Sequence, residues 1–314
     1  TTSPVPTPIG QAGELGQPGT QILFGGERVG DDARSGFGLD FERALDPCGT
    51  RTFGVGAIVL PESSANFFAD TNTYPILAVP FFNAGLAQED ASVVGFPGSR
   101  TGFVDIRDRQ SVYGADLYLK RLIYAECGTE VRLVTGYRFF QLNNQLNLTQ
   151  FADAFLVATQ ITQVDNFETE NQFHGGTLGL EMNRQVDCWT FNALARLHLG
   201  NMNQRVDING STTTVVGAGA PNVVNQGLFA WPTNSGLHER NRFATVPELE
   251  LSATRRLNSC WEASLGYTFI YWSDVVYAGD QIDRRINAAN LPAFNFNSTS
   301  DWVSGLNITL TGTY

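Results

Sequence analysis

Residues 302–314 read WVSGLNITLTGTY, and this stretch decides the fold class. Its large apolar side chains recur at even positions: Trp302, Leu306, Ile308, Leu310 and Tyr314. Asn and Thr residues fill most of the positions between them. Successive side chains of a β-strand point to opposite faces, so a period of two is the pattern of a strand. The stretch therefore predicts a strand with one apolar face and one polar face.

The same alternation recurs along the chain, in segments of ~10–13 residues where it is clearest, whereas strands of soluble sheets usually have ~5–6. A tilted strand needs ~9–11 residues to cross a bilayer. We therefore expect an all-β fold, a transmembrane antiparallel β-barrel of about ten strands. Counts of 8 or 12 are acceptable, because residues 61–110 could hold an extra hairpin. The clear segments are 130–140, 189–200, 243–256, 261–273 and 302–314, and the weaker ones are 20–27, 35–45, 51–60, 111–122 and 174–184.

Composition excludes two other classes of protein. The 314 residues carry 20 Lys+Arg against 31 Asp+Glu, a net charge of -11. A nucleic-acid binder needs the opposite sign to neutralise phosphates. No stretch approaches the ~18 apolar residues of a transmembrane helix, whereas barrel strands hide their hydrophobicity in alternation.

The N-terminal residues differ in composition from the rest. Residues 1–19 are rich in Pro, Gly, Thr and Gln, so we expect a flexible segment there and the barrel in residues 20–314. The segment shows no basic and apolar leader, so for an exported protein we expect a signal peptide that has already been removed.

Short and long connections alternate between the expected strands. Each of Cys48, Cys127, Cys188 and Cys260 lies in a short connection, and the long ones cover residues 61–110, 141–173, 207–240 and 274–300. Outer-membrane barrels have short periplasmic turns and long extracellular loops. We therefore expect the Cys turns and both termini on the periplasmic side. Pro247 lies inside an expected strand and requires a bulge or an unpaired position there.

The four cysteines permit disulfides, because export places them in an oxidising compartment. Three pairings are open, and we favour Cys48–Cys127 with Cys188–Cys260, since turns of like sequence would then pair. A zinc site is the alternative, but no CxxC spacing supports it. We expect no metal and no cofactor.

Two C-terminal segments resemble a known family. Residues 241–251 (NRFATVPELEL) and 266–284 (GYTFIYWSDVVYAGDQIDR) are similar to the C-terminal signature of the putative β-barrel porins of planctomycete bacteria. The N-x-F openings at 171–173 and 241–243 belong to the same likeness, which covers about the last 150 residues well. The resemblance implies an outer-membrane barrel and no catalytic residues. The aromatic Tyr314 at the end also resembles the assembly signal of outer-membrane proteins.

If the apolar faces of these strands meet lipid, their polar faces line the lumen with charges of both signs. Unpaired buried ions cost several kcal/mol, so these charges must pair or stay wet. Two interpretations stay open, a pore lining that selects ions and a salt-bridged plug in a narrow barrel. The expected lumen residues are Asp40, Glu42, Asp116, Lys120, Glu130, Arg132, Arg138, Glu181, Arg196, His198, Glu248, Glu250, Arg256 and Glu262.

Aromatic residues concentrate at the expected strand ends. Trp189, Trp261, Trp272, Trp302 and Tyr314 are candidates for girdles at the two membrane surfaces, where amphipathic rings lie at headgroup level. Packing in the core of a soluble sandwich is the alternative.

Catalytic motifs are absent from the sequence, which contains His174, His198 and His238 as its histidines. His238, followed by Asp274, Asp280 and Asp283 in the next loop, could imitate the rim site of an outer-membrane hydrolase. We do not expect an enzyme.

Three functions follow in order. The first is a porin-like barrel for passive passage of small polar solutes or ions. The second is a plugged barrel that acts as a structural, surface-assembly protein through its external loops. The third is the rim-sited hydrolase. Expected partners are outer-membrane lipid and, through the long loops, other copies or other surface proteins, with no nucleic acid.

Overall fold

The structure, a computed structural model, describes residues 1–26, 33–287 and 289–312. These residues form strands, connections and three single-turn 3-10 helices: η1 (Ile9–Gln11), η2 (Phe155–Val157) and η3 (Gly279–Gln281). None of the helices in this part of the chain has the length and apolar character needed to span a membrane. The all-β expectation is confirmed.

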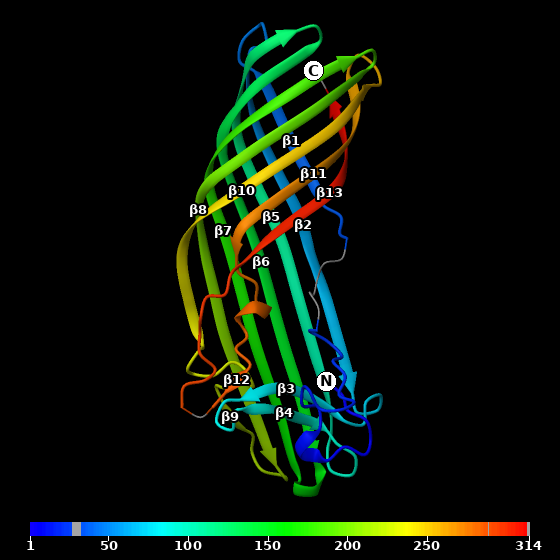
Figure 1. Ribbon diagram of the computed structural model, residues 1–314, viewed down its shortest axis with the longest axis vertical. Coiled ribbons are helices and arrows are strands. Elements are labelled where there is room, and N and C mark those ends of the chain that lie inside the picture. Colours follow the sequence, from blue (N-terminus) through cyan, green and yellow to red (C-terminus); the bar gives the residue numbers. More distant parts are fainter. Residues whose placement is uncertain (27–32, 288, 313–314) are drawn as a thin grey trace.

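One sheet forms the wall of the molecule, curled around a long axis (Figure 1). Each neighbouring pair along it is antiparallel. No hydrogen-bond ladder joins β1 to β13 in the described residues, so the sheet is curled but not closed. In order, its strands are β1 (Phe37–Ala44), β2 (Arg51–Asp70), β5 (Thr101–Glu126), β6 (Thr129–Ala154), β7 (Thr159–Val186), β8 (Trp189–Val216), β10 (Gly236–Arg256), β11 (Trp261–Val275) and β13 (Thr299–Gly312), with β9 (Asn222–Val224) beside β8.

The expected first strand, residues 20–27, is not a strand in the described part, residues 20–26. Gln21 forms an isolated bridge with Thr2, and in the described residues nine consecutive strands make up the wall, with β9 beside β8. Because successive strands of the wall alternate in direction, an odd number of them starts at one end of the wall and finishes at the other. The expectation that both termini share the Cys side is therefore wrong: the N-terminus lies at the opposite end (Figure 1).

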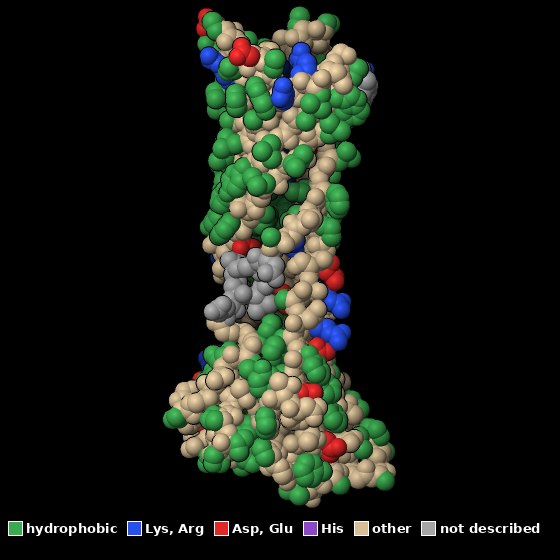
Figure 2. All heavy atoms as spheres, turned by 90° about the vertical axis from the view of Figure 1, so that its right-hand side faces the viewer, with side chains coloured by type: hydrophobic (Ala, Val, Ile, Leu, Met, Phe, Trp, Pro, Cys, Tyr) green, Lys and Arg blue, Asp and Glu red, His purple; other side chains and the backbone are tan. Residues whose placement is uncertain are grey.

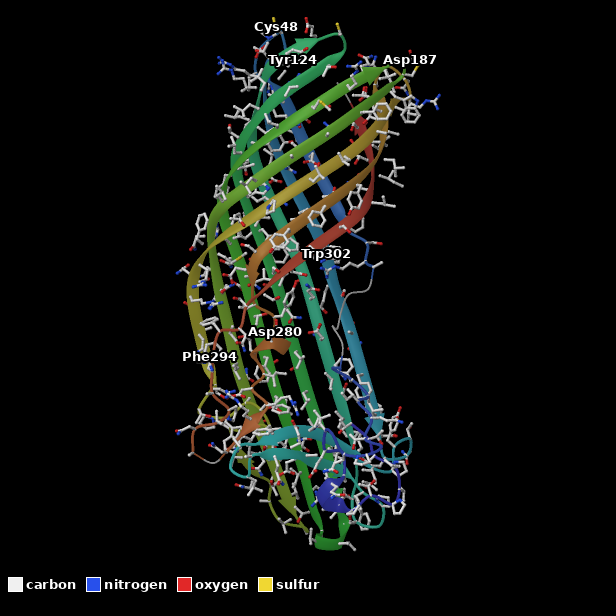
Figure 3. All side chains as sticks on the ribbon, in the orientation of Figure 1. Cys48, Tyr124, Asp187, Asp280, Phe294 and Trp302 are labelled. Atoms are coloured by element: carbon white, nitrogen blue, oxygen red, sulfur yellow. The ribbon has the colours of Figure 1, made fainter. Side chains whose placement is uncertain are left out.

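The central strands are far longer than the sequence pattern predicts. β5 to β8 have 26, 26, 28 and 28 residues. The expected loop 141–173 is therefore mostly strand, since β6 continues to Ala154 and β7 begins at Thr159. We call the half of the wall that ends at the four Cys turns the Cys half, and the other half the loop half. Figure 3 shows Cys48 and Asp187 at the end of the Cys half.

Apolar side chains change faces part-way along each long strand. In the Cys half of β7, Leu178, Leu180 and Met182 are exposed on the outer surface. In its loop half, Phe167 and Phe173 are fully buried inside the curled sheet. The first three positions are even and the last two are odd, so the alternation inverts within one strand. The outside is mainly apolar in the Cys half and mainly polar in the loop half, and the apolar clusters of the loop half lie inside, together with buried polar side chains such as Asp165 and Gln204.

This inversion explains why the strands look short in sequence. β6 inverts at Phe139–Phe140 and β8 between Leu199 and Met202. Beyond that level the outer face of β6 carries amides, Gln141 first among them. A sequence pattern that requires apolar residues on one face of the strand stops at the inversion, because beyond it the apolar residues lie on the other face. The apolar outer stretch of each strand is ~10 residues, the length of a tilted bilayer crossing.

The loop half is filled by connections that fold into the curled sheet. β3 (Leu77–Asn83) pairs with β4 (Gln88–Gly95) and with β12 (Arg285–Ile286) in a second sheet. Residues 1–19 lie against it: the Thr1 ammonium donates to the Ala78 carbonyl at 2.9 Å. The flexibility of this segment stays a prediction.

Pro247 is in register with Leu197 of β8 and is unpaired only on the side of β11. The β10–β11 ladder begins at Glu248, opposite Ile270. Two residues before Pro247, the Thr245 N–H donates to the Ser273 hydroxyl on the β11 side. Residues 245 and 247 point their nitrogens the same way, so Pro247 removes no ladder hydrogen bond.

Candidate functional site

A cavity of ≈ 2730 Å³ lies inside the curled sheet and runs along both unpaired edges, β1 and β13. Figure 2 views the face that carries β13 and shows a hollow in its upper half. We call the charged part of this cavity, in the Cys half, the chamber. Ten of the expected lumen residues line it: Asp40, Glu42, Asp116, Lys120, Arg138, Glu181, Arg196, Glu248, Glu250 and Glu262.

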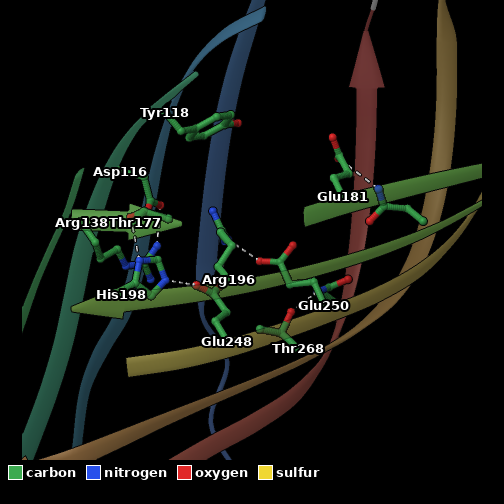
Figure 4. Close-up of polar contacts among 12 residues, drawn as sticks. Asp116, Tyr118, Arg138, Thr177, Glu181, Arg196, His198, Glu248, Glu250 and Thr268 are labelled. Carbon is green, nitrogen blue, oxygen red and sulfur yellow. Dashed lines mark hydrogen bonds and ion pairs between the residues drawn. The ribbon is translucent and has the colours of Figure 1, made fainter. Parts of the chain in front are cut away.

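Arg196 on β8 lies between two carboxylates of β10 (Figure 4). Its Nη2 donates to Glu248 Oε1 at 2.9 Å and to Glu250 Oε1 at 2.8 Å. The other oxygen of Glu248 lies 3.0 Å from Nε2 of His198. Nδ1 of His198 is 2.8 Å from the hydroxyl of Thr177. The Arg196 guanidinium therefore pairs with the carboxylates of both Glu248 and Glu250. These buried charges have partners, as burial requires.

Lys120 on β5 makes a second shared contact. Its ammonium lies 2.7 Å from Glu42 on β1 and 2.8 Å from Glu181 on β7. The Tyr118 hydroxyl donates to the same Glu42 at 2.9 Å. These contacts connect the edge strand β1 to strands farther along the wall. The sequence pattern predicted that these side chains share the lumen but not which of them pair.

A third ion pair joins Arg138 to Asp116 across the β5–β6 ladder. Asp116 and Asp40 face each other across Gly56, with which both are in register. A Cβ at position 56 would lie 2.7 Å from Asp40 Oδ1 and 3.0 Å from Asp116 Oδ2. A glycine there leaves the space between the two carboxylates open.

Four of the expected lumen residues do not line the cavity. Glu130 pairs with Arg132 at 3.0 Å, and Arg132 also donates to the Gly49 carbonyl in the Cys48 turn. Arg256 pairs with Glu262 at 3.3 Å next to the Cys260 turn. These residues lie at the rim of the Cys half. His198 is fully buried behind Glu248.

An apolar cluster, which we call the stopper, crosses the interior below the chamber. Phe140 and Trp272 stack within it, with their ring centroids 4.5 Å apart. Their strands, β6 and β11, are separated in the sheet by β7, β8 and β10, so the stack spans the interior. The stopper consists of Val112, Phe140, Leu142, Phe173, Met202, Ala244, Val246, Ile270, Trp272 and Val275.

Buried amides that the sequence analysis missed hold a connection against the stopper. Asn171 on β7 accepts from the Val276 N–H at 2.8 Å and donates to the Val276 carbonyl at 2.9 Å. Asn144 on β6 accepts from the Ala278 N–H at 2.8 Å. Both amides are buried on the inner face, where Asn144 also donates to Asp108 Oδ1 at 2.8 Å. The inverted alternation of β6 and β7 is the signal that could have placed them inside.

The comparisons with known proteins point the same way as the fold. A family model described as Putative beta barrel porin-7 matches residues 1–314, the whole chain. The chain belongs to this family. The resemblance seen in the C-terminal segments is thereby confirmed. Membership in a beta barrel porin family implies an outer-membrane location in bacteria and suggests a protein that is not an enzyme. No curated protein and no solved structure matches this porin-family chain.

The expected disulfides are wrong for this porin-family chain. Cys48, Cys127, Cys188 and Cys260 are all free and exposed. Neighbouring Cys turns are two strand spacings apart, about 10 Å, because two strands of the wall separate them. A disulfide needs Cα atoms at ~4.4–6.8 Å. The barrel wall therefore keeps like turns out of bonding range.

The aromatic girdle is wrong at one position. Trp272 is 2% exposed and belongs to the stopper. Tyr271, its neighbour in β11, faces outward, so Trp272 points to the inner face. Trp189, Trp261 and Trp302 are exposed on the outer surface, with Trp302 half-way along the molecule (Figure 3). For these three the girdle stays a prediction. Tyr314 lies outside the described residues.

The residues of the candidate rim hydrolase take part in ring stacking, a backbone contact and ion pairs. The His238 ring stacks on Phe294 at 3.6 Å between ring centroids, and its Nε2 contacts the Asn234 carbonyl. Asp274 lies 3.4 Å from Arg242, and Asp283 pairs with Arg285. In the described residues, no three His, Cys, Asp or Glu side chains gather as a metal site would require.

Proposed function

We propose that this chain is a passive channel for small polar solutes or ions in the outer membrane. The observation that carries the proposal is the extent of the cavity. Its lining runs from Glu181 and Asn192 in the Cys half to Leu148 and Phe229 in the loop half. Phe140 and Trp272 of the stopper line this cavity together with residues of β1 and β13. A cavity whose Cys half is lined by charged and polar side chains suits permeation without chemistry.

The proposal needs a closed wall, since open sheet edges do not occur in the hydrocarbon region. β1 and β13 are the first and last of nine alternating strands, so they run in the same direction. We therefore propose that they pair in parallel in the membrane and close a barrel. Its other pairs are antiparallel, as expected. Odd strand numbers are known among membrane barrels.

The membrane position follows from the inverted alternation. The apolar outer surface of the Cys half would face lipid, and the amide-rich outer surface of the loop half would face water. The Cys turns would then lie on the periplasmic side and the long hairpins outside the cell. In this arrangement the chamber lies within the membrane and the stopper near its outer surface.

Single-channel recording tests the proposed function. The purified full chain is reconstituted in a planar bilayer, and current is measured in symmetric salt. Discrete conductance steps are the expected result. A silent membrane, with folding shown by heat-modifiable gel mobility, would overturn the channel.

A plugged scaffold is the second candidate, favoured by the Phe140–Trp272 stack across the interior. In that case the loop half would present a surface for assembly with other surface proteins. A silent membrane together with ordered multi-chain arrays in electron micrographs would support it.

A further inference from the structure

The basic side chains of the chamber are shielded from water, and so are Glu181, Asp116 and Glu248, but other carboxylates are open. The basic side chains are nearly buried: Lys120 is 10% exposed, Arg138 5% and Arg196 9%. Several carboxylates are open instead, with Glu42 40% exposed, Glu250 33% and Glu262 34%. A solute in the chamber therefore meets carboxylates first.

The count of charges has the same sign. Seven carboxylates line the chamber, together with the three basic side chains named above, and one of the seven, Glu262, pairs with Arg256 at the rim. Lys120 and Arg196 each contact two carboxylates, so each group of three side chains has one more acidic than basic member. Arg43 also borders the cavity, but it follows Glu42 on β1 and so belongs to the opposite face of that strand.

The open space at Gly56 adds a third observation. Asp40 and Asp116 face it from either side, and Arg138 pairs with Asp116. Across the chamber, the inward-facing positions of β13 contribute neutral oxygens from Asn307 and Thr309. Oxygen ligands and excess negative charge favour cations, and low-dielectric walls concentrate that field.

We propose that the chamber selects cations over anions. This inference rests on the proposed function, because selection requires conduction. It names the permeant class, small hydrated monovalent cations. The mixed charges then have separate roles: the buried bases hold the wall together, and the open carboxylates determine which ions enter.

The test is the reversal potential of the full chain in a planar bilayer under a KCl gradient. The expected value has the sign of a potassium-selective channel, with cations several-fold more permeant than chloride. Raising the salt concentration should weaken the preference, since exposed charges are screened. Conductance with a reversal potential at zero, or of the opposite sign, would overturn the inference and leave the channel standing. Absence of conductance would overturn both.

Three variants assign the selectivity to the chamber. Glu250→Gln and Glu42→Gln keep shape and remove an open charge, and Asp40→Asn removes a carboxylate without breaking the Lys120 or Arg196 contacts. Each should lower the cation preference. Glu168→Gln, on the outer face of the loop half, is the matched control and should leave the reversal potential unchanged. A preference equal to that of the unaltered chain in all three chamber variants would overturn the assignment.

Discussion

Phe140 and Trp272 stack across the interior at 4.5 Å between ring centroids, although three strands separate them in the sheet. The two rings belong to the inner face of the wall at the level where its alternation inverts. A stack at this place narrows the cavity to the side bordered by β1 and β13. The size of the proposed channel therefore depends on one aromatic contact.

Truncating this contact should widen the channel. Trp272→Ala removes the larger ring, so we expect larger conductance steps and a loss of about 3–5 kcal/mol in unfolding free energy, the usual cost of truncating a buried aromatic. Single-channel recording and urea unfolding in lipid vesicles measure the two effects. Trp302→Ala, on the outer surface, is the control. Unchanged conductance in a folded Trp272→Ala protein would show that the stack does not limit flow.

The apolar outer band should respond to charge as a lipid-facing surface does. Leu180 is exposed on the outer face of β7, near the middle of its apolar stretch. Leu180→Arg should therefore lower the unfolding free energy in vesicles by ~2–4 kcal/mol, as a midplane charge does in barrels.

Asn209→Arg is the matched substitution for this test, because Asn209 is exposed on the outer face of β8 in the loop half. It should change stability by less than ~0.5 kcal/mol, as surface substitutions usually do. Equal costs at the two positions would contradict the proposed membrane position.

Parallel closure of the wall predicts contact between its two edges. In a protein whose four native cysteines are replaced by serine, Leu39→Cys on β1 is combined in turn with Leu306→Cys, Ile308→Cys and Leu310→Cys on β13. Oxidation in lipid vesicles should form an intramolecular disulfide in at least one combination, seen as a shift in gel mobility.

The control for closure pairs Leu39→Cys with Leu180→Cys, on a strand distant from β1 in the sheet. It should stay reduced within the monomer. Cross-links between two chains, or none in any combination, would mean that the edges of one chain do not meet.

Asn171 should fix the connection that follows β11. Its amide satisfies both the N–H and the carbonyl of Val276, and all three groups are buried. Asn171→Ala leaves two backbone groups unpaired, at about 1–3 kcal/mol each. We expect faster hydrogen exchange in residues 276–282, measured by mass spectrometry. Asn203→Ala, on the outer face of β8, should leave exchange there unaltered, and an equal response in both variants would contradict the role.

Much of the site was predictable from alternation, because it depends on local geometry. The period of two in residues 243–256 places Glu248 and Glu250 together on one face of a strand, and both line the chamber. The partners were not predictable, since Arg196 reaches both acids only through the β8–β10 register. The stopper was missed for a related reason: the sequence reading assigned a single apolar face to each strand, and Phe140 lies beyond the inversion.

By itself, the sequence determined the all-β class, the positions of the Cys turns and the faces of the strands in the Cys half, because backbone pleating converts residue order directly into side-chain direction. The tertiary structure decided what depends on non-local contacts. It arranged nine consecutive strands of the described residues into the wall, placed the N-terminus at the loop end and kept the cysteines apart. It also brought Phe140 to Trp272, since residues 132 positions apart meet only when the sheet curls.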